Sequence, residues 1–106
     1  MVNKNLLIWN KAKKIIPSGN SFLSKNPSRF PNKNWPIYFS KANGCEIWDL
    51  NNKKYYDFSF MGVGTNILGY ADKDIDKAVI NEIKKSNMSS LNSKFEVEFA
   101  DLLKKI

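Results

Sequence analysis

The sequence predicts an α+β fold: a helix near the N-terminus, a long irregular arm, a three-stranded antiparallel meander and two further helices. Apolar residues recur at helical spacing near both ends of the chain. Between them lie short runs rich in aromatic residues, separated by asparagine and glycine turn signals. A length of 106 residues leaves room for a single domain.

The first helix is expected over residues 5–16, and Pro17 ends it because proline cannot continue the backbone hydrogen bonding. The apolar residues of this segment lie near a helical repeat. They are Leu6, Trp9, Ala12, Ile15 and Ile16.

The segment 17–36 is too polar and too rich in proline for a regular element. We therefore divide the chain into an N-terminal helix and irregular arm, residues 1–36, and a region of meander and helices, residues 37–106. A loop as long as this arm is unusual in a free-standing domain, which indicates that it lies across another surface.

Three strands follow the arm, joined by two tight turns. The strands are expected over residues 37–41, 45–50 and 54–58. Asn43-Gly44 is a strong hairpin signal, typical of a turn with positive φ at both central residues. Asn51-Asn52 predicts a similar turn between the second and third strands, which completes a meander.

Two helices are expected after a loop that contains three glycines, Gly62, Gly64 and Gly69. The first covers residues 73–85, and the second begins with a capping box of Ser93 and Glu96. The second helix carries an apolar stripe of Phe95, Phe99, Leu102, Leu103 and Ile106. Its sequence has no C-cap signal and stops on a stripe position, so we expect the chain to be part of a longer protein.

The composition excludes several kinds of site. Cys45 is the only cysteine and there is no histidine, which rules out an internal disulfide, a zinc site and a histidine-based triad. We expect Cys45 to be a small buried hydrophobe. No apolar run is long enough for a secretory signal or a membrane span, so a reduced, cytoplasmic protein is expected.

The net charge of +7 comes almost wholly from lysine, with Arg29 the only arginine. A reader of bases or phosphates would favour the bidentate arginine fork, so nucleic acid is not the expected partner. A small basic nucleic-acid-binding module nevertheless stays open as an alternative, because aromatic residues and lysines could share one face of the sheet. They are Trp48, Tyr55, Tyr56, Phe58, Lys41, Lys53 and Lys54.

Two other patterns carry little chemistry by themselves. The segment 62–69 suggests a phosphate cradle, yet it lacks the Gly-Lys-Ser/Thr of a P-loop and the spacing of a dinucleotide-binding turn. Asp49 and Asp57 could form an acid/base pair, but structural charges at strand ends explain them as well.

Five segments, in the same order, resemble the class III (fold-type I) pyridoxal-phosphate-dependent aminotransferases, and glutamate-1-semialdehyde 2,1-aminomutase in particular. They are Ile15-Ile-Pro-Ser-Gly19, Ser21-Phe-Leu-Ser-Lys-Asn-Pro-Ser-Arg-Phe-Pro31, the meander from Gly44 to Phe58, Gly64-Thr-Asn-Ile-Leu-Gly-Tyr70, and the segment from Ser90 to Leu103. The resemblance covers nearly the whole chain, and it implies the N-terminal part of the small domain of such an enzyme.

The resemblance also implies which residues lie on the substrate side or at a dimer interface. The candidates are Ser21, Val63, Gly64, Thr65, Ser90 and Asn92, with Leu91 between the last two. The chain departs from the aminomutases at Ser24, where they have a substrate-carboxylate arginine, and at Val63, where they have a tryptophan. Thr65 also replaces a proline. The difference at Ser24 argues against glutamate 1-semialdehyde as the substrate.

The activity implied is the transfer of an amino group through a Schiff base between a lysine and pyridoxal 5′-phosphate. Small-molecule amino donors and acceptors and a homodimer are implied as partners. The family's Schiff-base lysine lies in the large domain, so no catalytic residue and no metal ligand is assigned here. The 106-residue chain alone is not expected to hold the cofactor. A structural or regulatory protein that docks onto a full-length aminotransferase stays open as a further alternative.

Overall fold

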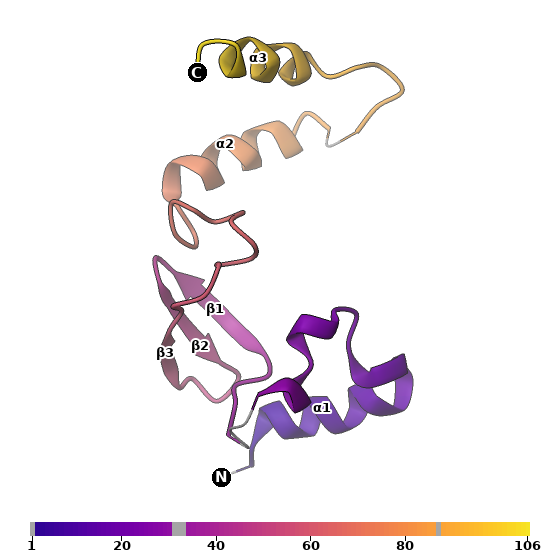
Figure 1. Cartoon of the computed structure of the whole chain (residues 1–106). Coiled ribbons are helices and arrows are strands. Elements are labelled where there is room, and N and C mark those ends of the chain that lie inside the picture. Colours follow the sequence, from indigo (N-terminus) through magenta and orange to yellow (C-terminus); the bar gives the residue numbers. More distant parts are fainter. Residues whose placement is uncertain (1, 31–33, 87) are drawn as a thin grey trace. The chain divides into compact units, whose positions relative to one another are not determined.

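The computed structural model describes residues 2–30, 34–86 and 88–106, and over these it confirms the predicted α+β fold (Figure 1). The elements are α1 (Lys4–Ile15), β1 (Phe39–Asn43), β2 (Glu46–Asp49), β3 (Lys54–Tyr56), α2 (Lys73–Ile83) and α3 (Lys94–Leu103). Contacts divide the chain into two compact units, residues 1–72 and 73–106, which we describe separately. The boundary between these units follows residue 72 and does not test the sequence-based division after residue 36, which stays a prediction.

Helix α1 begins and ends within one residue of the prediction. The side chain of Asn3 caps it, accepting from the N–H groups of Asn5 at 3.1 Å and Leu6 at 3.3 Å. The last hydrogen bond runs from the Ile16 N–H to the Ala12 carbonyl at 2.8 Å, directly before Pro17. Asn5 and Ala12 are its buried residues, while most of the predicted apolar positions stay exposed.

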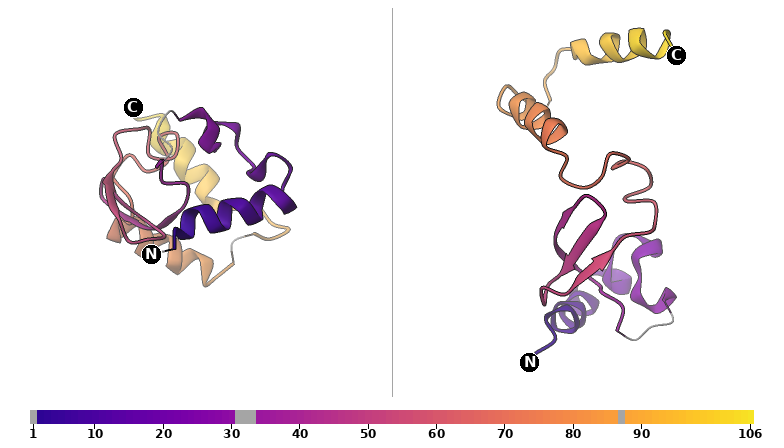
Figure 2. Two further views of the ribbon diagram at one scale, coloured as in Figure 1. Left: turned by 90° about the horizontal axis from the view of Figure 1, so that it is seen from below. Right: turned by 90° about the vertical axis from the view of Figure 1, so that its left-hand side faces the viewer.

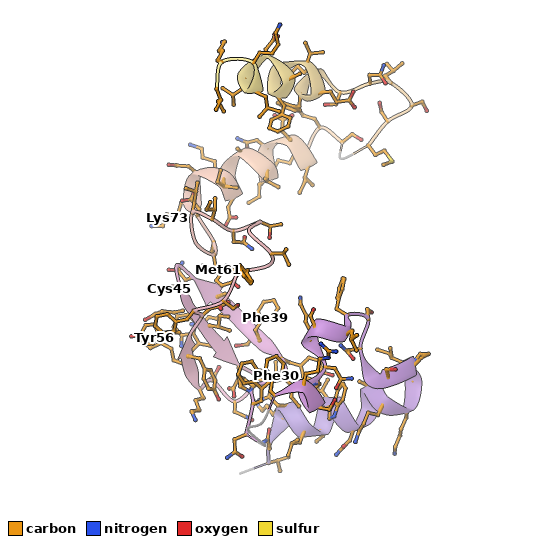
Figure 3. All side chains as sticks on the ribbon, in the orientation of Figure 1. Phe30, Phe39, Cys45, Tyr56, Met61 and Lys73 are labelled. Carbon is orange, nitrogen blue, oxygen red and sulfur yellow. The ribbon has the colours of Figure 1, made fainter. Side chains whose placement is uncertain are left out.

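The arm contains more regular structure than the sequence predicts. It holds three single 3₁₀ turns, η1 (Pro17–Gly19), η2 (Leu23–Lys25) and η3 (Pro27–Arg29). Proline opens η1 and η3 because its fixed φ suits the first helical position. Phe30 and Trp35 stack with ring centroids 3.9 Å apart, and Figure 3 shows Phe30 on the arm. The predicted arm proline Pro31 lies outside the described residues.

The three strands form the predicted meander in the order β1-β2-β3, with both pairs antiparallel. Because directly paired residues share a face, one face carries Lys41, Trp48 and Lys54. Residues on the other face include Ala42, Ile47 and Tyr55. Figure 2 shows from two sides that the turn between β2 and β3 lies beside the start of α1.

The first hairpin turn is shifted from the predicted position. Strand β1 begins at Phe39 and continues to Asn43, which pairs with Glu46, so the turn residues are Gly44 and Cys45. Only Gly44 of this pair has a positive φ, +54°. The expectation of a buried cysteine is also wrong, since Cys45 is exposed at this hairpin tip (Figure 3).

The second turn is confirmed at Asn51-Asn52, where Asn52 takes a φ of +62°. The N–H of Asn52 donates to the carbonyl of Asp49 at 3.0 Å, and the N–H of Asp49 donates to the carbonyl of Lys53 at 3.0 Å. The turn is therefore closed by Asp49 on one side and Lys53 on the other.

The second unit consists of α2, α3 and their connection. Helix α2 has Asp74 and Asp76 in its first turn, where negative charge favours the helix dipole. The Ser93 hydroxyl caps α3 by accepting from the Phe95 N–H at 3.3 Å. The apolar residues of both helices are exposed, and Asn87 of the predicted link lies outside the described residues. Within the described residues, no helix is both long and apolar enough to span a membrane.

Candidate functional site

The candidate site is the loop of residues 57–70, which we call the glycine loop. Its two ends meet: the Tyr70 hydroxyl donates to Asp57 Oδ2 at 2.7 Å. Gly44 and Tyr70 exchange two backbone hydrogen bonds of 2.8 Å, so the loop also returns to the hairpin tip. The glycine loop is therefore a compact loop with closely spaced ends.

Gly69 is needed for this closure. A Cβ atom at Gly69 would lie 3.1 Å from the Cα atom of Gly44, and the φ of Gly69 is +98°. An L-residue side chain is disfavoured by both the close approach and the backbone angle. The third glycine of the sequence motif thus has a structural reason.

The interior of the glycine loop is held by its own hydrogen bonds. The Gly64 N–H donates to the Phe60 carbonyl at 2.7 Å, and Thr65 Oγ1 donates to the Gly62 carbonyl at 2.8 Å. The Asn66 amide donates to the carbonyl of Met61 at 3.1 Å. Figure 3 marks Met61 on this loop.

The predicted residues Val63, Gly64 and Thr65 lie together at the exposed part of this loop. Val63 is 92% exposed and has a φ of +61°, which is unusual for a β-branched residue. Gly64 has a φ of +79°, and a Cβ atom built on it would meet nothing within 4 Å. The backbone here is thus accessible to a ligand, and the side chains leave the space above it open.

The electrostatics of the loop ends favour the observed hydrogen bond. Burial raises the pKa of Tyr70, and its bond to the Asp57 carboxylate raises it further, to about 12. For Asp57, burial acts to raise the pKa, but hydrogen bonds from Tyr70 and Ser59 together outweigh burial and lower it. Tyr70 is therefore the donor and ionised Asp57 the acceptor over the neutral pH range.

The other candidates lie apart from the loop or in the second unit. Ser21 is exposed on the arm between η1 and η2, and no hydrogen bond among the described residues joins it to the glycine loop. Ser90 and Asn92 are exposed in the connection between α2 and α3. The structure brings together Val63, Gly64 and Thr65, and the substrate-side role of all six candidates stays a prediction.

Asp49 has a structural role that sequence reasoning only outlined. The residue is buried, with 4% of its surface exposed. Oδ1 accepts from the N–H groups of Asn51 and Lys53 at 2.8 and 2.9 Å. Oδ2 accepts from the Asn5 amide at 3.1 Å and the Tyr55 hydroxyl at 3.3 Å. A buried carboxylate needs such partners, and the one from Asn5 attaches α1 to the sheet.

The structure does not support the hypothesis that Asp49 and Asp57 act together as an acid/base pair. Burial raises the pKa of Tyr55, as does the adjacent Asp49 charge, so Tyr55 stays a neutral donor to this carboxylate. Asp57 is occupied by Ser59, whose N–H and hydroxyl donate to Oδ1 at 2.8 and 2.7 Å. Each aspartate is thus engaged with its own donors.

The aromatic residues do not form one continuous platform for stacked bases. Trp48 and Tyr56 share a face, whereas Tyr55 lies on the opposite face and bonds to Asp49. Lysine ammonium groups lie over the rings, with Lys41 4.6 Å from the Trp48 centroid and Lys54 5.3 Å from the Tyr56 centroid. The nucleic-acid-binding alternative therefore finds no support in the arrangement.

The described residues do not form a site that fits pyridoxal phosphate. A pocket beside α1 has Asn5, Asp49, Lys53 and Tyr55 among its lining residues. The Asp49 carboxylate disfavours a phosphate there, and its four donors leave no buried polar group unpaired. Within the described residues there is also no group of three or more side chains placed to hold a metal ion.

Comparison with known proteins finds similar sequences among the enzymes that the motifs indicated. It is 34% identical over 99 residues to glutamate-1-semialdehyde 2,1-aminomutase of Nitrosopumilus maritimus, an alignment that covers 93% of the chain and 22% of the relative. It is 32% identical over 81 residues to 3-aminobutyryl-CoA aminotransferase of Cloacimonas acidaminovorans, covering 76% of the chain and 19% of the relative. No protein-family model matches.

Solved structures share the fold. An omega-transaminase from Sphaerobacter thermophilus matches with a TM-score of 0.80 at 23% identity, covering 97% of this chain and 22% of that one. The FumI protein of Sphingopyxis sp. MTA144, solved in its PLP internal aldimine form, matches with a TM-score of 0.79 at 24% identity over 92% of this chain and 23% of that one. The predicted resemblance to aminotransferases is therefore confirmed over nearly the whole chain, which spans about a fifth of the length of these relatives.

Proposed function

We propose that the chain is the N-terminal part of the small domain of a pyridoxal-phosphate-dependent class III aminotransferase or aminomutase. The intact enzyme transfers an amino group between a small-molecule donor and acceptor, and it works as a cytoplasmic homodimer. The observation that carries this proposal is the alignment of 93% of the chain, at 34% identity, with an aminomutase.

The role assigned to this chain is to shape the substrate side of the active site. Val63, Gly64 and Thr65 offer an exposed backbone on a loop whose own hydrogen bonds hold it in shape. Pyridoxal phosphate, when bound by the intact enzyme, supplies an electron sink for the amino-group chemistry. The described residues do not fit the cofactor, so no step of that chemistry is assigned to them.

The choice between aminotransferase and aminomutase follows from the substrate. Ser24, which is exposed in η2, stands where the resemblance places an arginine for a substrate carboxylate. A serine cannot form the bidentate ion pair that arginine makes with a carboxylate. We therefore propose that the substrate is not glutamate 1-semialdehyde, and that the enzyme is an aminotransferase of another small amine.

The experiment that tests the proposed function compares the product of the intact gene with the 106-residue chain. Both are purified, mixed with pyridoxal phosphate and examined for a protein-bound cofactor absorbance band and for amino transfer from a panel of amines. We expect the band and the transfer with the intact product, and neither with the 106-residue chain.

Two results would contradict the proposal. One is an intact product that binds no cofactor and transfers no amino group. The other is a 106-residue protein that accumulates as the sole product of the gene and binds RNA with an affinity that falls steeply with salt, as expected of a nucleic-acid-binding module. Co-purification of the 106-residue product with a separate aminotransferase would favour the docking alternative.

A further inference from the structure

The neck of the glycine loop contains two polar side chains for which the proposed function gives no role. Asp57 lies where the meander ends, and Tyr70 lies where the loop ends. The Tyr70 hydroxyl and the Asp57 carboxylate are 2.7 Å apart, and the same carboxylate accepts two hydrogen bonds from Ser59. One carboxylate thus holds the first and the last residues of the loop together.

A second attachment joins the loop to the rigid part of the unit. The backbone of Tyr70 pairs with Gly44 in both directions, and the Asp57 N–H donates to the Cys45 carbonyl at 2.8 Å. Both contacts lie at the hairpin tip, whose position is set by the ladder between β1 and β2. The loop neck is therefore fixed to the sheet as well as to itself.

The glycine loop has internal backbone hydrogen bonds, and its apolar side chains are exposed to solvent. Its exposed apolar side chains are Phe58, Phe60, Val63, Ile67 and Leu68. A loop that is ordered before a ligand arrives loses less conformational entropy on binding than a flexible one. Such a loop presents its binding groups in a fixed geometry only as long as its neck stays closed.

We propose that Asp57 and Tyr70 are positioning residues, which clamp the glycine loop so that Val63, Gly64 and Thr65 meet the substrate in one geometry. This inference rests on the proposed function, because it takes the loop to lie on the substrate side. The clamp acts on binding and not on the reacting bonds, so its loss raises KM and leaves kcat nearly unchanged.

The test uses the intact enzyme with Tyr70→Phe, which removes the donor and keeps the ring. Steady-state kinetics and amide hydrogen exchange at Gly64 and Gly69 are measured together. We expect KM for the amino acceptor to rise about tenfold with kcat within about twofold, since a hydrogen bond to a charged group is lost. Exchange of the two amides is expected to become about tenfold faster.

Two further variants separate the clamp from general damage. Asp57→Asn removes the charge and one of the two acceptor oxygens, so either Tyr70 or Ser59 loses its acceptor. We therefore expect changes in KM and exchange at least as large as those of Tyr70→Phe. Tyr38→Phe is the matched control: this tyrosine lies outside the loop, and its backbone N–H donates to Asn5 Oδ1 at 3.2 Å. We expect the control to leave KM and exchange unchanged.

Each contrary outcome has a separate meaning. Unchanged exchange in Tyr70→Phe would show that the bond does not order the loop, and faster exchange with unchanged KM would show that loop order does not position the substrate. Either result overturns the inference. An intact wild-type product without amino transfer would instead overturn the proposed function, and the substrate-positioning role with it.

Discussion

Gly19 and Gly64 have the same backbone φ of +79°, but their surroundings differ. A Cβ atom at Gly19 would lie 2.5 Å from Cη2 of Trp9, since the indole ring packs directly against this glycine. At Gly64 the same atom would meet nothing within 4 Å. The pair therefore separates the effect of backbone angle from that of packing.

We expect Gly19→Ala to destabilise the first unit by about 3 kcal/mol and Gly64→Ala by about 1 kcal/mol. Both variants introduce a disfavoured backbone angle, and only Gly19→Ala also displaces Trp9. Urea unfolding followed by tryptophan fluorescence measures the difference. Equal losses in the two variants would show that the contact between Gly19 and Trp9 contributes nothing.

Single residues also show which structural features could be predicted from the sequence and which could not. The stop at Pro17 follows from local chemistry, because proline lacks the N–H that a helix needs. The bond between Asn5 and Asp49 joins residues 44 positions apart, and nothing in either neighbourhood specifies it. Cys45 was misjudged because a hairpin tip exposes its residues whatever their hydrophobicity.

At the scale of elements, the first hairpin shows how a tertiary contact overrides a turn signal. The dipeptide Asn43-Gly44 favours positive φ at both residues, yet Gly44 alone adopts it. Gly44 must pair with Tyr70 on one side while it turns the chain on the other. The partner at Tyr70 lies beyond any window that a local signal covers, so the shift could not be predicted.

The sequence predicts the glycine loop as an irregular connection. It does not predict that the two ends of the loop are joined by hydrogen bonds. The three glycines indicate unusual backbone angles, which the structure confirms at Gly62, Gly64 and Gly69. The hydrogen bond between Tyr70 and Asp57 gives no periodic signal. The family resemblance indicates the exposed part of the loop, whereas its neck depends on a contact between residues 13 positions apart.

The pH dependence of the loop neck follows from its two titrating groups. Folding raises the pKa of Tyr70 from about 10 to about 12, so the contribution of its bond is complete below about pH 10 and lost as the pH rises toward 12. The pKa of Asp57 is lowered in the folded chain, so its contribution is present at neutral pH and lost in acid. The neck is therefore closed across the neutral range.

We expect one tyrosine of the wild-type protein to ionise near pH 12, in a titration followed by tyrosinate absorbance. Tyr70→Phe should remove this highest step, and Tyr38→Phe should retain it. If the step survives in Tyr70→Phe, the hydroxyl bonded to Asp57 is not the one that titrates last.

At the scale of the whole molecule, the described residues bury very little apolar surface. Among them Ala12 is the only buried hydrophobic residue, and many large apolar side chains are exposed. In the second unit, α3 exposes Phe95, Phe99 and Leu102, of which Phe99 is 62% exposed. Exposed apolar surface on this scale marks a region that packs against another surface.

We expect the isolated 106-residue chain to self-associate at micromolar concentrations, as measured by sedimentation velocity, because the apolar face of α3 is uncovered. Phe99→Ser should weaken the association. Asp101→Ser is the matched control on the same helix, since the Asp101 side chain is 66% exposed and forms a long ion pair of 3.8 Å with Lys104. Equal behaviour of both variants would show that α3 takes no part.

The fold class and the order of the elements were predictable at this scale, because each element has its own periodicity. Helix α3 and the meander are confirmed in their predicted order, although Ile106 of the predicted stripe lies beyond the end of α3 at Leu103. What covers the exposed side chains could not be predicted from the same periodicity, since a stripe identifies a face and not its partner.

The network around Asp49 has a consequence for the order of events during synthesis. Asn5 is synthesised long before Asp49 and Tyr55, two other members of this network. The Lys4 N–H likewise has its acceptor, Asn51 Oδ1 at 3.0 Å, in a part of the chain that is synthesised later. Helix α1 can coil early, but it cannot dock until the β2–β3 turn has emerged and closed a loop of more than forty residues. The nascent chain therefore carries a helix that is not yet attached to the sheet until the meander is complete. An interruption in this interval leaves the sheet-facing residues of α1 free to bind elsewhere.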